Sequence, residues 1–330
     1  MALSSIENYS AVSRNSSPTS LWSLQKKILS LPKHQIPKCI ADAVESTKNK
    51  KVPMEQHVET LTLQFNNFLS KQMNNDNTSE AVYTPATLEL YDAIVWEFNA
   101  PFHWRIRPQQ VEDFYRIGLM SSQRHCEVAV GTGLFLRQWA TTKTRQPPKL
   151  EQVTLMDLSV SSLESCYNRL QEVDLFQHHV NVHKVQANIL EPPPSHLCGT
   201  FDSVAANFLL HCLHGNSMQD KKAAIQSCAT LLNPIHGVFF GSTILGKALD
   251  ADAEAAGPYA ISTNVVYNKL GIFGNRGDSF DDLATILKEC FHSVAIWRIG
   301  YCAVWIARRP VGPNEQSLFT KYETILPPIE

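Results

Sequence analysis

Apolar residues recur every three to four positions between residues 20 and 98, which is the period of an amphipathic helix. The longest such stripe runs from Val58 to Leu69, and a later one from Leu88 to Phe98 begins just after Pro85, where a first-turn proline belongs. We predict helices here and no strand. The Ser- and Asn-rich residues 1–19 predict a disordered tail.

The pattern changes near residue 126, where short β-rich runs start to alternate with helical stretches. Strands are predicted at 126–130, 153–156, 180–185, 203–206, 237–242, 293–298 and 301–307, and helices near 108–118, 134–141, 160–173, 217–232, 257–270 and 279–290. Such alternation indicates an α/β fold with a doubly wound, mostly parallel sheet covered on both faces. Only Ile299 and Gly300 separate the last two strands, which predicts an antiparallel hairpin at the edge of this seven-stranded sheet.

These patterns predict one large domain at 83–310. Residues 20–82 form an N-terminal helical extension without a sheet of its own, and residues 311–330 form a C-terminal tail. The extension is expected to act as a lid over the site or to pair two subunits in a homodimer.

Charge is balanced, with 29 Lys and Arg against 31 Asp and Glu, a formal net charge of -2. This balance argues against a nucleic acid or an anionic membrane surface as partner, because both require concentrated positive charge. The longest apolar run, Ser293 to Ile306, is interrupted by Arg298 and is shorter than the roughly 18 residues of a membrane span. A small, weakly charged molecule is the expected partner.

The eight cysteines contain no Cys-x-x-Cys pair, and no apolar signal segment opens the chain. We therefore expect free thiols and a cytoplasmic protein. His211, His214 and the group His178, His179 and His183 do not supply a complete ligand set at a known metal spacing, so no metal site is predicted.

Residues Glu127 to Gly133 read as a strand that enters a glycine turn and then a helix, the place where α/β proteins bind nucleotide-like ligands. A dinucleotide fingerprint requires a third glycine at the position of Leu136. The acidic Glu127 disfavours a pyrophosphate but suits a ligand with an ammonium and a sulfonium group. The alternative is a glycine turn that only packs the helix on the strand.

Polar residues follow the next three strands in order. Asp157 closes a strand 24 residues after Gly133 and is placed to accept hydrogen bonds from two ribose hydroxyls. Asn188 can present an amide to an adenine edge, and Asn207 ends a buried strand that leads to His211. Four such features at the carboxyl ends of strands are more specific than any one of them.

With these motifs, the sequence resembles the class I S-adenosylmethionine-dependent methyltransferases, within the small-molecule group called type 11 or 12 or UbiE-like, and most of all a microbial subgroup. The resemblance spans roughly residues 83 to 310, and it implies a Rossmann-like methyltransferase fold. It rests on these blocks: Tyr91-Asp92, Phe102-His103-Trp104-Arg105, Val130-Gly131-Thr132-Gly133, Met156-Asp157-Leu158, Asn207 to Leu213, Phe240 to Gly246, and Tyr267 to Phe273.

Carried over residue by residue, the resemblance implies S-adenosyl-L-methionine as cofactor and S-adenosyl-L-homocysteine as product. The implied cofactor residues are Glu127, Gly131, Thr132 and Gly133 for the methionine part, Asp157 and Leu158 for the ribose, Asn188 and Ile189 for the adenine, and Asn207 and Phe208 for the methyl-donor channel. Ala129 stands where the family has its first glycine, which is tolerable if the backbone there does not have a positive φ.

Methyl transfer needs a base only if the acceptor is protonated. His211 follows the fourth parallel strand and is the candidate catalytic base, or else a residue that caps the strand or shapes the pocket. Tyr91, Phe102 and Trp104 are predicted either to form an aromatic lid over the sulfonium or to pack in the core. The predicted acceptor pocket contains Tyr259, Tyr267, Asn268 and Phe273.

The predicted function is methyl transfer from S-adenosylmethionine to an oxygen, nitrogen or carbon of a small, mostly apolar metabolite, in secondary metabolism. One alternative is an isomerase or cyclase that keeps the fold but transfers no methyl group. Another is a non-catalytic accessory partner that acts through its helical extension. Fold by itself does not separate these three.

Overall fold

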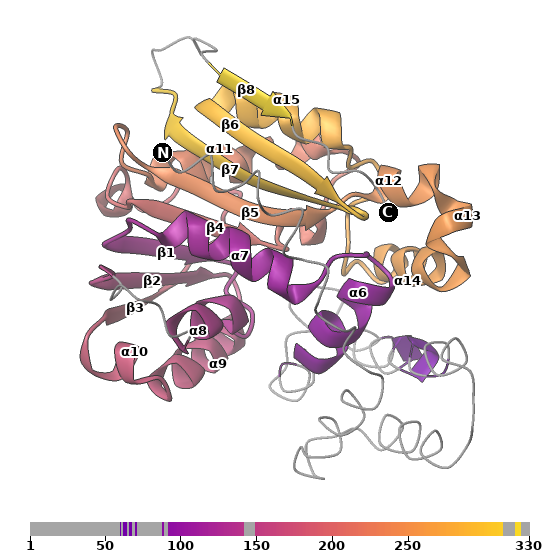
Figure 1. Ribbon diagram of the computed structural model, residues 1–330, viewed down its shortest axis with the longest axis horizontal. Helices are drawn as coiled ribbons and strands as arrows, with labels where there is room; N and C mark the ends of the chain where they lie inside the picture. Colours follow the sequence, from indigo (N-terminus) through magenta and orange to yellow (C-terminus); the bar gives the residue numbers. More distant parts are fainter. Residues whose placement is uncertain are drawn as a thin grey trace.

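The computed structural model describes residues 92–141, 149–312 and 321–324, together with positions 60, 62–64, 66, 67, 70 and 88. An open, twisted sheet runs through the centre of this part of the chain (Figure 1). In chain order the strands are β1 (Arg124–Val128), β2 (Gln152–Asp157), β3 (Asn181–Gln186), β4 (Ser203–Asn207), β5 (Val238–Ile244), β6 (Phe291–Ile299), β7 (Cys302–Pro310) and β8 (Lys321–Thr324).

The sheet has the order β3-β2-β1-β4-β5-β7-β6-β8. Strands β1 to β5 are parallel, and β7 is antiparallel to both β5 and β6, so the predicted doubly wound sheet with its terminal hairpin is confirmed. The hairpin turn is Gly300 and Tyr301, one residue later than predicted. The short β8 pairs in parallel with β6 and adds an eighth strand to the seven predicted, within the segment predicted as a tail.

Thirteen helical segments of the described chain matter here, and those predicted from residue 108 onward are all present. They are η3 (Asp92–Asn99), α6 (Ala100–Phe102), α7 (Pro108–Leu119), α8 (Leu134–Thr141), α9 (Val160–Gln171), α10 (Asp174–His178), η5 (Leu210–Cys212), η6 (Met218–Lys221), α11 (Lys222–Leu231), α12 (Gly246–Ala251), α13 (Ala253–Ala256), α14 (Pro258–Lys269) and α15 (Phe280–Cys290). The short α10, α12 and α13 were not predicted, because single turns carry little periodicity.

Local sequence explains where several helices begin. Ser159 caps α9 by accepting a hydrogen bond from the Ser162 amide at 3.2 Å, and Ser279 caps α15 in the same way. Pro108 and Pro258 occupy the first turns of α7 and α14, where the missing amide hydrogen costs nothing.

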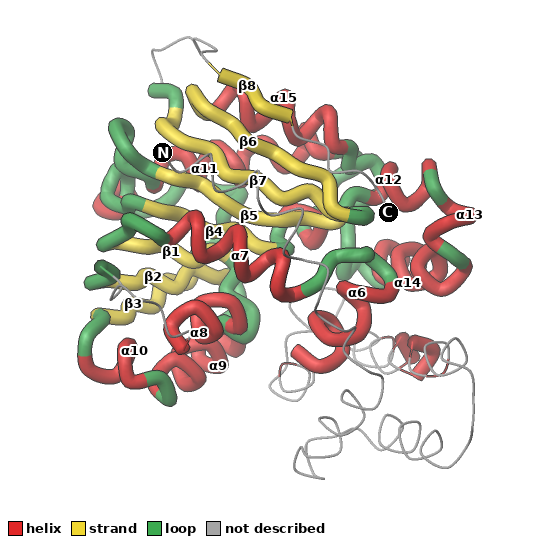
Figure 2. The backbone as a smooth tube through the Cα atoms, viewed as in Figure 1, coloured by secondary structure: helices red, strands yellow, loops and turns green. Residues whose placement is uncertain are grey.

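Helices cover both faces of the sheet. Helices α7, α8 and α9 lie on one face, and α11 and α15 lie on the other (Figure 1). Helices α12 to α14 lie beyond one end of β5, clear of both faces (Figure 2). The central strands are therefore buried on both sides, as the continuous apolar run of β4 predicts. The carboxyl ends of β1 to β4 remain available for a ligand.

The N-terminal extension lies almost entirely outside the described residues, and so does the dimer predicted to form through it. The described chain enters the domain through η3, a π-helix that continues into α6. Tyr91 lies immediately outside this described segment.

Three further findings concern the described residues alone. None of their helices has the length and apolar character needed to cross a membrane. Their seven cysteines are all free thiols. No three of their His, Cys, Asp or Glu side chains gather closely enough to hold a metal ion.

Candidate active site

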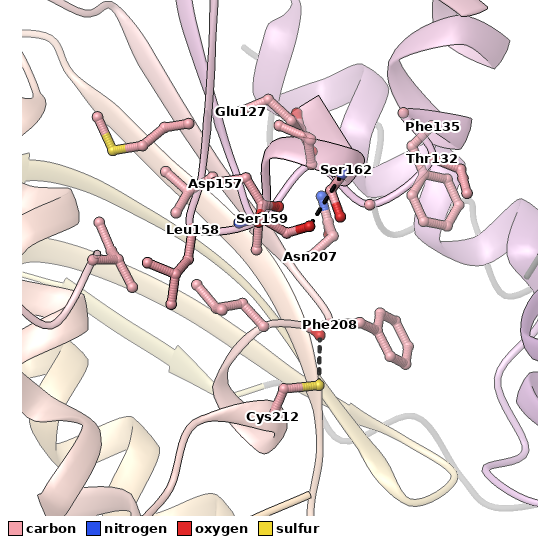
Figure 3. A pocket seen from close by; sticks show the side chains of 18 of the residues that line it. Glu127, Thr132, Phe135, Asp157, Leu158, Ser159, Ser162, Asn207, Phe208 and Cys212 are labelled. Carbon is pink, nitrogen blue, oxygen red and sulfur yellow. Dashed lines mark hydrogen bonds between the residues drawn. The ribbon is translucent and has the colours of Figure 1, made fainter. Parts of the chain in front are cut away.

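A cleft opens at the carboxyl ends of β1 to β4, with Trp96 of η3 on its wall. It contains about 1070 Å³ of empty space, part of which is open to solvent. All ten residues predicted to bind the cofactor line it: Glu127, Gly131, Thr132, Gly133, Asp157, Leu158, Asn188, Ile189, Asn207 and Phe208. Figure 3 shows how Asp157, Leu158, Asn207 and Phe208 gather around the same space.

The turn after β1 has a left-handed backbone at three positions. Gly131 and Gly133 have φ values of +50° and +68°, and a Cβ at Gly133 would lie 2.5 Å from the Cys166 sulfur of α9. Glycine is therefore needed for conformation at both positions and for helix packing at the second. Ala129 has φ +57°, which contradicts the expectation that its methyl group sits on an ordinary backbone.

Glu127 is buried at the end of β1 and forms hydrogen bonds through one oxygen. Its Oε2 accepts a hydrogen bond from the Tyr115 hydroxyl of α7 and lies 2.9 Å from His125 Nε2. His125 Nδ1 in turn lies 2.8 Å from Ser203 Oγ on β4. Burial and the charge of Glu127 raise the pKa of Tyr115 well above its usual value, so the hydroxyl stays protonated and remains a donor.

Sequence reasoning did not identify Tyr115, His125 or Ser203. The available signal was the alternation along β1, because His125 and Glu127 are two residues apart and therefore point to the same side of the sheet. Tyr115 and Ser203 come from other elements, and no local pattern links them to Glu127.

Asp157 ends β2 with its side chain half-exposed. Its Oδ1 accepts a hydrogen bond from the Ser159 amide at 2.8 Å, in the turn that leads into α9. Leu158, beside it, is 46% exposed, which is unusual for a leucine and leaves an apolar surface at the edge of the cleft. A carboxylate next to an apolar surface suits a ribose joined to a base.

Asn188, which follows β3, uses its amide within its own turn. Its Oδ1 accepts from the Leu190 amide at 3.1 Å, and its Nδ2 donates to Glu191 at 3.2 Å. Ile189, between them, is buried and lines the cleft. The turn therefore presents backbone and an apolar side chain to the cleft, and the predicted contact of the Asn188 amide with adenine stays a prediction.

Asn207 and Phe208 form the far wall of the cleft, where β4 ends. Asn207 Oδ1 accepts from the Ser242 hydroxyl at 3.1 Å, whereas its Nδ2 is buried and has no partner among the described residues. Phe208 adopts a left-handed φ of +55°, and its ring meets Trp96 edge to face at 4.5 Å. An unpaired amide donor and a strained residue are frequent features of ligand sites.

Asp92, near the start of η3, ties that helix to the glycine turn. Its Oδ1 accepts from Thr132 Oγ1 at 2.5 Å, and its Oδ2 pairs with Arg169 of α9 at 2.7 Å. Arg169 also donates to the Leu88 carbonyl at 3.2 Å. Trp96, one turn later, lies edge to face with Phe135 at 4.5 Å. These contacts fix the helix that carries Trp96 against the cleft.

The described residues among those predicted for catalysis and acceptor binding are absent from the lining of the cleft. His211 and Trp104 are buried, and the His211 ring contacts Phe273 at 4.5 Å and Phe208 at 5.7 Å. Tyr267 packs edge to face on Phe273 at 4.9 Å. Phe102 and Tyr259 are half-buried. Phe208 therefore both lines the cleft and contacts the His211 ring.

Burial and the charge of Lys221 lower the pKa of His211 well below its usual value, so its imidazole is neutral at neutral pH. The His211 amide donates to Thr243 Oγ1 at 3.0 Å, and its Nδ1 lies 3.4 Å from the same oxygen. The ring is thus held in place in its neutral form.

Hydrogen bonds also hold the segment that follows α14. The Asn268 side chain forms two bonds with Asn275, at 2.8 and 3.2 Å. The hydroxyl of Tyr267, near the end of α14, accepts a hydrogen bond from Asn99 at 3.2 Å, which connects α14 to η3. Asn268 therefore has a structural role in this fold, and its contact with an acceptor stays a prediction.

A fully buried ion pair supports the same segment. Lys221 Nζ donates to Asp278 and, at 2.8 Å, to the Gly274 carbonyl, and neither charged side chain reaches solvent. Burial raises the pKa of Asp278 to about 6 and lowers that of Lys221. The Gly274 amide donates to the His211 carbonyl at 2.8 Å, so the ion pair and His211 are part of one structure.

Comparison with known proteins gives one consistent result. A family described as methyltransferase domain matches residues 126–239. Demethylluteothin O-methyltransferase of Streptomyces thioluteus is 33% identical over 228 residues, which cover 69% of this chain and 90% of that protein. The physcion biosynthesis cluster O-methyltransferase of Aspergillus chevalieri is 28% identical over 236 residues, 70% of this chain and 94% of that protein.

Among solved structures, an O-methyltransferase family protein from Burkholderia thailandensis superposes with a TM-score of 0.53 at 16% identity, covering 77% of this chain and 71% of that one. That likeness concerns the fold. The sequence relatives and the domain match, taken with the cleft at the carboxyl ends of β1 to β4, place this chain in the family of class I S-adenosylmethionine-dependent methyltransferases that act on small molecules.

Proposed function

We propose that this methyltransferase methylates a hydroxyl oxygen, phenolic or enolic in character, on a small and mostly apolar acceptor of secondary metabolism. The proposal is supported by the two O-methyltransferase relatives, one of which is named for a biosynthesis cluster. The free thiols of the described residues fit a reducing compartment, and we propose the cytoplasm.

The residues of the cleft fit the cofactor. The buried, unpartnered Asn207 Nδ2 offers a donor to a ligand, and a Cβ added to Gly131 would project into open space where a ligand can approach the backbone. When bound, S-adenosylmethionine supplies an electrophilic methyl group on a positively charged sulfur. The protein then contributes mainly alignment, worth up to roughly 7–11 kcal/mol in favourable cases.

We assign the residues as follows. Glu127 pairs with the amino group of the cofactor, with the turn at Gly131, Thr132 and Gly133 beside it. Asp157 accepts from the ribose hydroxyls beside Leu158, and Ile189 packs against the adenine with Asn188 at its edge. Asn207 and Phe208 lie at the methyl-transfer end. The support is that all of these side chains line one cleft in the order of the strands.

The lowered pKa of His211 limits the chemical class of the proposed acceptor. A neutral imidazole with a lowered pKa is a weak base, and it takes a proton readily only from an acidic hydroxyl. Phenols and enols meet that condition and aliphatic alcohols do not. We therefore propose His211 as the base for such an acceptor, reached when Phe208 moves aside, with Trp104, Tyr267 and Phe273 as the apolar surroundings. We propose that the outer wall of the acceptor pocket contains Phe102, Tyr259, Asn268 and Tyr91.

The test is incubation of the full chain with a CD₃-labelled cofactor and matched phenols, enols, alcohols and amines. We expect a labelled methoxy product and one equivalent of S-adenosylhomocysteine, from phenols or enols only. A labelled N- or C-methyl product would contradict the proposed acceptor atom. A rearranged, unlabelled product would point instead to the isomerase or cyclase.

A His211→Asn variant tests the base in the same assay. We expect turnover to fall by about 10²- to 10⁴-fold while cofactor affinity stays constant. Thr243→Val, which removes only the hydroxyl beside the ring, serves as the matched control and should lose far less. Full turnover in His211→Asn would remove His211 as the base.

A further inference from the structure

The two oxygens of Glu127 have different surroundings. Its Oε2 takes both hydrogen bonds, from Tyr115 and with His125, while Oε1 has no hydrogen-bond partner among the described residues. The side chain is 7% exposed and yet lines the cleft. One oxygen is therefore held by the protein and the other remains for a ligand.

The two partners of Glu127 cannot easily turn away. His125 is completely buried and stacks on the Phe240 ring at 5.9 Å, and the Tyr115 ring meets the same phenyl ring edge to face at 5.3 Å. Ser203 Oγ lies 2.8 Å from His125 Nδ1 and forms a hydrogen bond with Ser122 Oγ at 2.7 Å. The orientation of the imidazole is thus fixed on both sides.

We propose that Tyr115 and His125 are positioning residues, which hold Oε2 of Glu127 so that Oε1 faces the amino group of the cofactor, with Ser203 fixing the His125 ring. This proposal rests on the proposed role of Glu127 in binding that amino group. It extends the binding site to three residues that do not line the cleft.

The physical reason is the cost of a buried carboxylate. A charged oxygen without hydrogen-bond donors is strongly disfavoured away from water. If Tyr115 loses its hydroxyl, Oε2 keeps only its contact with His125, and the carboxylate is free to rotate away from the orientation that turns Oε1 toward the ligand. The cofactor's amino group then finds a misoriented partner, while the ribose and adenine contacts at Asp157 and Ile189 are unaffected.

The experiment compares two thioether ligands that react with nothing: S-adenosylhomocysteine, and 5′-methylthioadenosine, which lacks the amino acid part. Calorimetry of Tyr115→Phe and His125→Gln should show about tenfold weaker binding of S-adenosylhomocysteine, the equivalent of one hydrogen bond to a charged group. Binding of 5′-methylthioadenosine should change less than twofold. Tyr301→Phe, which removes a hydroxyl bonded to Asp252 at 3.1 Å and not to Glu127, should alter neither.

Equal losses of affinity for both ligands would overturn the proposal, because they would mean that Tyr115 and His125 support the whole cleft and not the contact with the amino group. Unchanged binding of both would overturn it as well. If Tyr115→Phe does not fold, Ser203→Ala applies the same test from the other end of the network, with a smaller loss expected for S-adenosylhomocysteine alone.

The Glu127→Gln variant distinguishes the positioning proposal from the assignment of Glu127 to the amino group of the cofactor, on which it rests. If that change leaves the ratio of the two affinities as it was, the assignment of Glu127 to the amino group fails. If it lowers the ratio while Tyr115→Phe and His125→Gln do not, only the positioning proposal fails. In the Glu127→Gln background, Tyr115→Phe should cause no further loss of affinity for S-adenosylhomocysteine, whereas a merely structural tyrosine would still lower the affinity for both ligands.

Discussion

Two regions of this enzyme meet at Phe208. The proposed cofactor region, residues 127–133, 156–159, 187–189 and 207–209, consists of strand ends and the turns after them, which line one open cleft. The proposed acceptor region, residues 98–106, 211 and 259–278, contains aromatic rings and amides that contact one another. The first is built from short segments that the sheet brings together, and the second from contacts between distant elements.

With the proposed assignment, this difference would allow a family to keep one cofactor and change its acceptors. Strand ends are fixed by the pairing of the sheet, so a cofactor bound there is insensitive to changes in the surrounding helices. A wall made of packed side chains can be altered one residue at a time. The two regions should therefore respond separately to substitution, and the following predictions test that separation.

Asp157→Ala should have the largest effect, confined to the cofactor region. Loss of two hydrogen bonds from ribose hydroxyls to a carboxylate, at about 1.5–3 kcal/mol each, weakens cofactor binding more than 100-fold. Stability should change little, because Asp157 is half-exposed. Calorimetry with S-adenosylmethionine measures the loss. Asp174→Ala, which removes a carboxylate that is 83% exposed, is the control, and unchanged affinity in Asp157→Ala would mean that the nucleoside binds elsewhere.

Lys221→Met should show the opposite pattern, confined to the acceptor region. It leaves the carboxylate of Asp278 buried without a counter-ion, which costs about 3–5 kcal/mol of stability. Denaturant titration measures this loss, and cofactor affinity in the remaining folded protein should stay within about twofold. The neighbouring Lys222→Met removes an exposed pair with Glu289 and should cost less than about 1 kcal/mol. Similar losses in both variants would contradict the role given to the buried pair.

Asp92→Asn should affect both regions at once, more weakly. Helix η3 contacts the glycine turn through Asp92 and Thr132, and it contacts the acceptor region through Asn99 and Tyr267. Removal of the charge that pairs with the largely buried Arg169 should cost about 1–3 kcal/mol. We expect a several-fold loss of cofactor affinity together with a raised KM for the acceptor.

Asp113→Asn, beside the exposed Arg116 at 3.9 Å, is the matched control for Asp92→Asn and should be silent. If Asp92→Asn changes only the affinity for the cofactor or only the KM for the acceptor, η3 does not connect the two regions.

The same division explains what the sequence could predict. The alternation of strands and helices follows from local pattern, and so do the candidates Asp157, Asn188 and Asn207, because each lies at or near the carboxyl end of its own strand. Thr132, Leu158, Ile189 and Phe208 came from the family resemblance. Tyr115, Ser203 and Asp92 were not predictable, because each acts through a partner on another element. For Trp104 the sequence left open both core packing and a lid over the sulfonium, and for Phe273 it predicted an acceptor contact, because a buried aromatic residue has the same sequence pattern in either role.

The smallest effect is expected at Ala129, where the structure corrected the sequence most directly. At φ +57° an alanine is strained by about 1–2 kcal/mol, and glycine relieves this strain. Glycine also makes the unfolded chain more flexible, which offsets about 0.5–1 kcal/mol of the relief. Ala129→Gly should therefore stabilise the protein by about 0.5–1 kcal/mol in denaturant titration, with cofactor affinity unchanged. Ala140→Gly, within the regular α8, should instead destabilise it by about 1 kcal/mol. If both changes destabilise the protein, the left-handed backbone at Ala129 does not carry the expected strain, and the turn after β1 tolerates alanine there at no cost.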